Sequence, residues 1–128
     1  MRGYGRSSAP SDAILYTPLQ TTGDLVGLLD ALKISTAVLV GHDWGATHAW
    51  NAALMRPDRF KAVFCLSVPY VPRGDVSIFE RMRKSGHQND FYMFEQIRPD
   101  ADQVWVDAAV TIPGVLYLGL GSAPDDQR

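Results

Sequence analysis

The chain has 128 residues, enough for one small domain, and its 46% hydrophobic and 20% charged composition excludes a disordered protein. A net charge of −2, from 14 acidic against 12 basic residues, gives no electrostatic reason to expect nucleic acid or an anionic membrane as a partner. The single cysteine, Cys65, excludes an intrachain disulfide and a cysteine-built metal site, and we expect no metal or cofactor.

Residues 1–12 are rich in Gly, Ser, Pro and Arg, which predicts a loop. No apolar stretch follows them, so they do not form a secretory signal. Nor does any apolar run in the chain approach the roughly 20 residues of a membrane helix. We therefore expect a cytoplasmic protein.

A helix is expected after this loop, with Thr17 as its N-cap and Pro18 at its first helical position. Four leucines that recur at i, i+3, i+4 and i+7 predict one apolar face of this helix. These leucines are Leu25, Leu28, Leu29 and Leu32.

Residues 35–41 are short, rich in β-branched side chains and almost wholly apolar, which is typical of a buried strand in a parallel sheet. A helix is expected over residues 45–55, ended by Pro57, and a second apolar strand over residues 60–68. Strand, helix and strand with short connections make a βαβ unit, whose strands should be parallel. The expected apolar face of the helix comprises Ala46, Ala49, Trp50, Ala53 and Leu54.

The pattern changes near Pro69, and the remaining sequence predicts helices with irregular links. Phe79 and Met82 mark one short helix, and residues 104–110 predict another. We therefore expect an α/β protein in which residues 1–72 contain the βαβ unit and residues 73–128 form a separate helical layer.

The stretch that carries chemistry is Gly-His-Asp-Trp-Gly-Ala, residues 41–46, where the first strand meets the helix. A sharp strand-to-helix turn needs small residues on either side of Asp43, because larger side chains would collide as the backbone folds back. The turn would expose Asp43 at the carboxyl end of the strand, where open α/β sheets bind ligands. An ordinary strand–helix turn is the alternative. The small residues are Gly41, Gly45 and Ala46.

An aspartate at such a turn points to substitution at an sp3 carbon. A serine that attacked an epoxide or alkyl halide would form an ether, which water does not readily cleave. The Asp43 carboxylate would form an alkyl ester, whose carbonyl activated water can attack while backbone donors hold the oxyanion. The residue type therefore favours this chemistry over acyl transfer.

Residues 41–46 resemble the nucleophile elbow of epoxide hydrolases in the α/β-hydrolase superfamily. Residues 2–8, Arg-Gly-Tyr-Gly-Arg-Ser-Ser, resemble the Arg-Gly-x-Gly-x-Ser loop of that family. Residues 66–70, Leu-Ser-Val-Pro-Tyr, resemble the exit from the next strand into the cap. The resemblance implies a partial α/β-hydrolase core over residues 1–72 and the start of a helical cap over residues 73–128.

The resemblance also implies roles for individual residues. Asp43 matches the nucleophile, and Trp44 matches the residue whose backbone N–H contributes to the oxyanion hole and whose ring lines the pocket. Gly41, His42, Gly45 and Ala46 match the structural positions of the elbow. Tyr92, within residues 91–96, matches the cap tyrosine that donates to the epoxide oxygen, although the Phe-Gln pair after it departs from the family spacing. A packing role in the cap is the alternative for Tyr92.

No histidine of the chain is well placed as a general base. The side chain of His42 should point away from the nucleophile, His48 falls inside the helix after it, and His87 sits in a surface loop. In the family the base and its supporting acid lie downstream of the cap. We therefore expect the 128-residue chain to be poorly stable, to self-associate through exposed sheet edges, and to be inactive alone.

The resemblance implies a small-molecule epoxide as substrate and a diol as product. A haloalkane dehalogenase is an alternative, since it uses the same Asp-Trp elbow with Trp44 as a halide ligand. A truncated chain without enzymatic activity and a binding module built on the hydrolase fold are alternatives from other classes.

Overall fold

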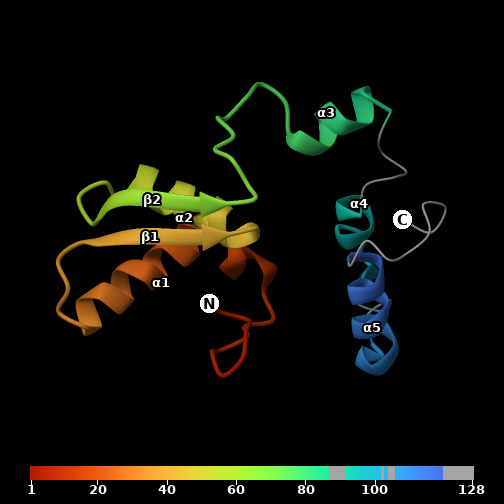
Figure 1. Ribbon diagram of the computed structural model, residues 1–128, viewed down its shortest axis with the longest axis horizontal. Helices are drawn as coiled ribbons and strands as arrows, with labels where there is room; N and C mark the ends of the chain where they lie inside the picture. The colour runs from red at the N-terminus through yellow and green to blue at the C-terminus, as the bar shows by residue number, and fades with distance from the viewer. Residues whose placement is uncertain (87–91, 102, 104–105, 120–128) are drawn as a thin grey trace. The chain divides into compact units, whose positions relative to one another are not determined.

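The computed structural model describes residues 1–86, 92–101, 103 and 106–119. The chain divides into two compact units, Met1–Pro72 and Arg73–Arg128. Figure 1 shows the first unit as two adjacent strands with helices packed beside them. Its elements are the 3-10 helix η1 (Ala13–Tyr16), α1 (Pro18–Ala31), β1 (Ala37–His42), α2 (Trp44–Met55) and β2 (Phe60–Leu66).

Helix α1 begins where the sequence predicts, because Pro18 occupies its first position. Thr17 precedes it in extended conformation, but its side chain makes no capping hydrogen bond. The predicted leucine face is only partly covered. Leu29 is buried, whereas the side chains of Leu28 and Leu32 are more than half exposed.

Strands β1 and β2 are parallel, as the βαβ pattern predicts, with Leu39 opposite Val63 and Gly41 opposite Cys65. The second strand ends two residues earlier than expected, at Leu66. Ser67 causes this, since its φ of +70° leaves the extended region that a strand requires.

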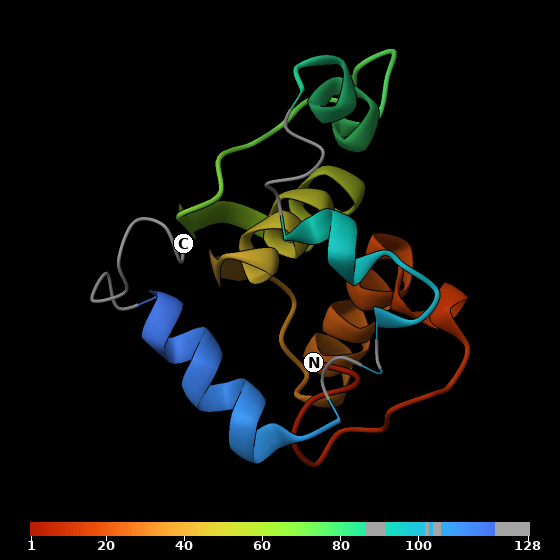
Figure 2. The ribbon, with the colours of Figure 1, turned by 90° about the vertical axis from the view of Figure 1, so that its right-hand side faces the viewer.

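The core of the first unit lies on one face of the two strands, where α2 packs against both strands and α1 packs against α2. Figure 2 shows the two helices on the same side of the strands. Leu29, Ala52 and Phe60 form the centre of this core. Ala46, Ala49 and Ala52 are the buried residues of α2. Leu54, expected on the apolar face, is 60% exposed.

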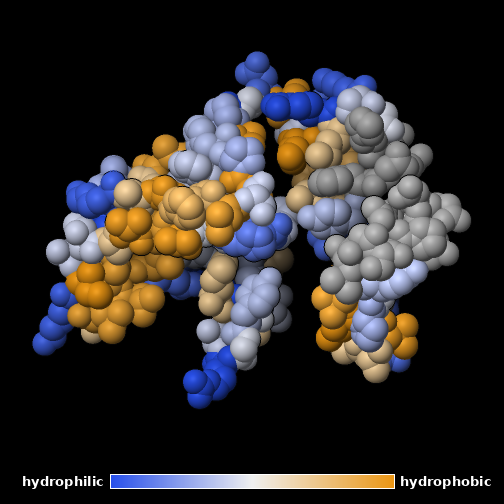
Figure 3. All heavy atoms as spheres, in the orientation of Figure 1, coloured by the Kyte–Doolittle hydropathy of each residue, from blue (hydrophilic) through white to orange (hydrophobic). Residues whose placement is uncertain are grey.

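The other face of the strands is exposed, which corrects the prediction of a buried strand over residues 35–41. Val40 is 71% exposed and Phe64 opposite it is 60% exposed. Within the described part of the chain only α2 makes substantial contact with these strands, and it covers the opposite face. Figure 3 shows hydrophobic residues gathered over this part of the first unit. The exposed apolar face comprises Val38, Val40, Phe64 and Leu66.

An arginine joins the start of β2 to the end of α1. Arg59 donates from Nε to the carbonyl of Ser35 over 2.8 Å and from a terminal nitrogen to the carbonyl of Ile34 over 3.1 Å. It also pairs with the Asp30 carboxylate at 2.7 Å. Arg59 therefore fixes the turn that leads into β1.

The second unit contains three described helices, α3 (Ile78–Lys84), α4 (Met93–Gln96) and α5 (Ala108–Gly119). The rings of Phe79 and Phe94 meet edge to face at 5.4 Å, and the Arg83 guanidinium lies 5.5 Å from the Phe94 ring centre. These contacts hold α3 against α4. No helix in the described ranges is long and apolar enough to cross a membrane.

The helix predicted over residues 104–110 begins later, at Ala108. The Asp107 carboxylate accepts a hydrogen bond from the Ala109 N–H over 3.0 Å. A side-chain oxygen in this position caps a helix and sets its first residue. Residues 104–105 lie outside the described residues.

A polar contact links α1 to α2 inside the first unit. The Thr21 hydroxyl lies 2.8 Å from Nδ1 of His48, and Thr21 is buried. Burial lowers the pKa of His48 below its usual 6.5, because the charged imidazole loses hydration.

Acidification should therefore destabilise the first unit. The folded state binds fewer protons at His48 than the unfolded state does, so the free energy of unfolding is highest above pH 6.5 and falls as the pH drops towards the lowered pKa. Urea denaturation at about pH 7.5 and about pH 5.5 measures this loss. His48→Leu should reduce the loss and Thr21→Val should retain it. If the His48→Leu chain lost as much unfolding free energy between these pH values as the unmodified chain, groups other than His48 would cause the pH dependence.

Candidate active site

Asp43 alone forms the turn between β1, which ends at His42, and α2, which begins at Trp44. Its backbone has φ +54° and ψ −126°, a strained conformation for a residue with a side chain. Backbone hydrogen bonds on both sides of the residue hold it. The Asp43 N–H donates to the carbonyl of Leu66 over 3.3 Å, and the Asp43 carbonyl accepts from the Ala46 N–H over 2.9 Å.

The turn is closed by a contact between backbones. A Cβ at Gly41 would lie 2.5 Å from the Gly45 carbonyl oxygen and 2.7 Å from Cα of Ala46, so only glycine fits. Ala46 is fully buried. Gly45 differs from the prediction, because a Cβ there would meet no described atom within 4 Å. The turn thus requires small side chains at residues 41 and 46. Gly45 takes part through its backbone carbonyl group, which lies against Gly41.

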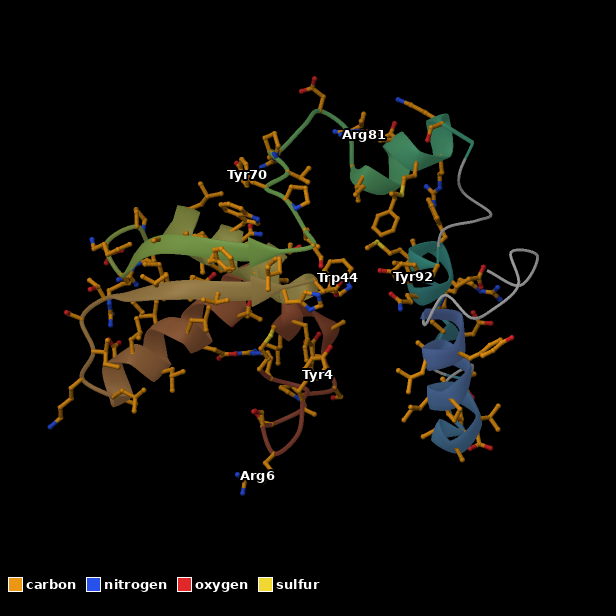
Figure 4. All side chains as sticks on the ribbon, viewed as in Figure 1. Tyr4, Arg6, Trp44, Tyr70, Arg81 and Tyr92 are labelled. Atoms are coloured by element: carbon orange, nitrogen blue, oxygen red, sulfur yellow. The ribbon has the colours of Figure 1, made fainter. Side chains whose placement is uncertain are left out.

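The Asp43 carboxylate is exposed at the carboxyl end of β1, and its Oδ2 accepts a hydrogen bond from the Trp44 N–H over 2.7 Å. Trp44 is 49% exposed, and Figure 4 shows its side chain at the carboxyl end of the strands. His42 is also exposed. The turn therefore presents a carboxylate together with a backbone donor that can hold negative charge.

A cavity of about 610 Å³ adjoins the turn and is lined by Asp43, Trp44 and His48 on one side. The N-terminal loop forms another part of its wall through Arg2 and Tyr4. His48 thus lines the same cavity as Asp43, which sequence reasoning did not predict because it placed this residue in the helix interior.

An ion pair anchors the N-terminal loop to α1. The Arg2 guanidinium donates to both oxygens of Asp24 over 2.7 and 2.6 Å, and to the carbonyl of Leu15 over 2.6 Å. The hydrogen bonds from Arg2 lower the pKa of the Asp24 carboxyl. Sequence reasoning recognised the loop by its Arg-Gly pattern but missed Asp24, because a spacing of 22 residues carries no local signal.

The remaining candidates lie elsewhere. Tyr92 belongs to the second unit, where it directly precedes α4 and is 52% exposed. His87 lies outside the described residues. Cys65 is partly buried, and its sulfur lies 3.7 Å from the Ala46 carbonyl oxygen, as suits a packing residue. Among the described residues, no group of His, Cys, Asp and Glu could hold a metal ion.

Comparison with known sequences supports one family. Residues 1–109 match the family described as alpha/beta hydrolase fold. An epoxide hydrolase of Caballeronia sordidicola is 81% identical over all 128 residues, which span 39% of that relative. Epoxide hydrolase A of Mycobacterium tuberculosis is 48% identical over 92 residues, 72% of this chain and 29% of its own. The chain thus spans less than half the length of these relatives.

Solved structures agree with the sequences. An epoxide hydrolase from an endophytic Streptomyces matches 89% of this chain and 35% of its own, with a TM-score of 0.80 and 38% identity. An epoxide hydrolase of Vigna radiata matches 90% of this chain and 38% of its own, with a TM-score of 0.80 and 37% identity.

Two alanine substitutions test the backbone contact at the turn. Gly41→Ala should destabilise the first unit by about 3 kcal/mol, because the new methyl group has no space in the packed turn. Gly45→Ala should change the free energy of unfolding by less than about 1 kcal/mol, towards greater stability, since alanine favours a helix. Denaturant unfolding of both variants measures this difference. Equal stability of the two variants would contradict the geometry.

Proposed function

This chain belongs to the α/β-hydrolase fold family, and on that premise we propose that it is part of an epoxide hydrolase with Asp43 as its nucleophile. The observation that carries the proposal is the exposed Asp43 carboxylate with Oδ2 hydrogen-bonded to the Trp44 N–H. The names of its relatives, which are epoxide hydrolases, supply the substrate class.

The first step forms an ester. Oδ1 of Asp43 attacks an epoxide carbon, the ring C–O bond breaks, and the electron pair goes to the epoxide oxygen. Tyr92 then donates its phenolic proton to this oxygen, since an alkoxide is a poor leaving group. The product is a hydroxyalkyl ester of Asp43, whose Oδ2 has become the ester carbonyl oxygen.

The second step cleaves the ester. Water attacks the ester carbonyl carbon, and the negative charge develops on Oδ2, where the Trp44 N–H already donates at 2.7 Å. Collapse of the intermediate breaks the Cγ–Oδ1 bond, so Oδ1 leaves with the diol and the water oxygen takes its place in the restored carboxylate. Of the two protons of the water, one passes through a base to the departing diol oxygen and the other restores the Tyr92 phenol. A base must take the proton of the attacking water. We propose that this base lies in the part of the longer protein that these 128 residues do not span.

We also propose that residues 1–72 are part of the hydrolase core and residues 73–128 are the start of a helical cap. The division of the chain into units that meet at Pro72 supports this assignment. The helical character of the described second unit fits a cap, since it contains α3, α4 and α5.

A polypeptide of these 128 residues should form the ester and accumulate it. After exposure to styrene oxide, intact-mass analysis should show one addition equal to the mass of the epoxide, and peptide mapping should locate it on Asp43. The matched control Asp43→Asn should show no addition there, because an amide is a poor nucleophile. Equal labelling of the control would refute the assignment, and diol release at a catalytic rate would show that the chain supplies its own base.

The role of Tyr92 can be tested in the same reaction. Tyr92→Phe should slow alkylation of Asp43 by about 100-fold, the lower range for loss of a general acid. Tyr117→Phe removes a hydroxyl from α5, in the same unit, and should leave the rate unchanged. If the two variants react equally fast, Tyr92 has only a packing role.

A further inference from the structure

Two residues other than glycine have strained backbones at neighbouring strand ends. Asp43 follows β1 with φ +54°, and Ser67 follows β2 with φ +70°. A positive φ costs free energy in a residue with a Cβ, and such a conformation persists only where surrounding contacts enforce it. Contacts that hold Ser67 are therefore part of what shapes this end of the sheet.

The carbonyl groups of the residues before and after Ser67 both accept hydrogen bonds, one from Asp43 and one from Trp50. The Leu66 carbonyl accepts from the Asp43 N–H over 3.3 Å. The Val68 carbonyl accepts from the indole Nε1–H of Trp50 over 3.2 Å. The backbone is thus held immediately before and immediately after its strained residue.

The Trp50 ring makes a second contact with the same segment. It packs against Tyr70 with ring centres 5.6 Å apart and an angle of 58° between the planes. Figure 4 shows Tyr70 on the segment that follows β2. Trp50 lies in α2, which packs against β2. That position lets an α2 side chain reach the segment beyond the neighbouring strand.

We infer that Trp50 is a positioning residue for Asp43. Its indole N–H holds Val68, this bond fixes the turn at Ser67, and the turn keeps the Leu66 carbonyl where it accepts the Asp43 N–H. The inference rests on the proposed function only in giving Asp43 a catalytic role. A tryptophan that served packing alone would need its ring but not its N–H donor.

Trp50→Phe separates these possibilities, because it keeps an aromatic ring and removes the donor. In the 128-residue chain, amide hydrogen exchange at Asp43 should quicken about tenfold relative to Leu39 in β1, as the loss of one hydrogen bond implies. Asn51→Ala is the matched control. It removes a 2.8 Å hydrogen bond to the Thr47 carbonyl on the same helix and should leave exchange at Asp43 unchanged.

A second substitution tests the role of the turn. Glycine adopts a positive φ without a steric penalty, so Ser67→Gly should restore slow exchange at Asp43 in the Trp50→Phe chain. Failure of this rescue, or equal exchange in the Trp50→Phe and Asn51→Ala chains, would overturn the inference.

The unmodified chain supplies an independent measurement. The Trp50 indole N–H should exchange about tenfold more slowly than that of the half-exposed Trp44 in ¹H–¹⁵N spectra, with both signals assigned by substitution to Phe. Equal exchange of the two indoles would overturn the inference without any variant having to fold. None of these readouts requires a substrate. A chain that never reacts with an epoxide would refute the proposed function and leave this inference standing.

Discussion

The close approach of β1 to the first turn of α2 determines how the candidate site is built. The Gly45 carbonyl oxygen lies where a side chain at residue 41 would have to be, so the strand and the helix meet without side chains between them. This contact forces the whole change of direction onto Asp43 and leaves its carboxylate at the turn. The same geometry brings the Trp44 N–H to Oδ2, so the proposed nucleophile and the proposed oxyanion donor have one structural cause.

The close approach of α2 to the strands continues along the helix, where small residues face the strands. Ala46, Ala49 and Ala52 allow the helix to lie close to the strands, but they bury little apolar area. Large side chains instead remain exposed on the other face of the sheet, as Val40 and Phe64 show. The first unit therefore combines a closely fitted turn with a small core, and polar contacts such as that between Arg2 and Asp24 add to its cohesion.

Local patterns in the sequence predicted the fold of the first unit well. Apolar runs, together with Pro18 and Pro57, located the start of α1 and both ends of β1, α2 and β2 to within two residues. The pairing of Arg2 with Asp24 and the bond from Trp50 to Val68 could not be predicted, because both depend on segments that meet only in the folded chain. The prediction of which apolar side chains are buried failed for a related reason. The exposure of a side chain depends on which segments cover its face of the strand or helix, and the spacing of apolar residues does not give this.

The site residues show the same division. The spacing of glycines around Asp43 predicted the turn, but the need for glycine proved to differ between residues 41 and 45. The difference lies in the distance from each glycine to neighbouring backbone atoms, which only the folded structure gives. In the sequence, both positions are simply glycines two residues from Asp43. The positive φ of Ser67 also had no sequence signal, since serine rarely adopts it.

The order of contacts along the first unit has a consequence for how the fold can diversify. Each major contact between elements joins neighbours in the chain or elements separated by one other, as in α1 with α2 and β1 with β2. The pairs of residues that these contacts join, such as Ala37 with Phe60 and Thr21 with His48, all lie within residues 1–72. The direction of the Asp43 side chain is therefore settled within this unit. Distant parts of a longer protein can accordingly vary without displacing the Asp43 carboxylate.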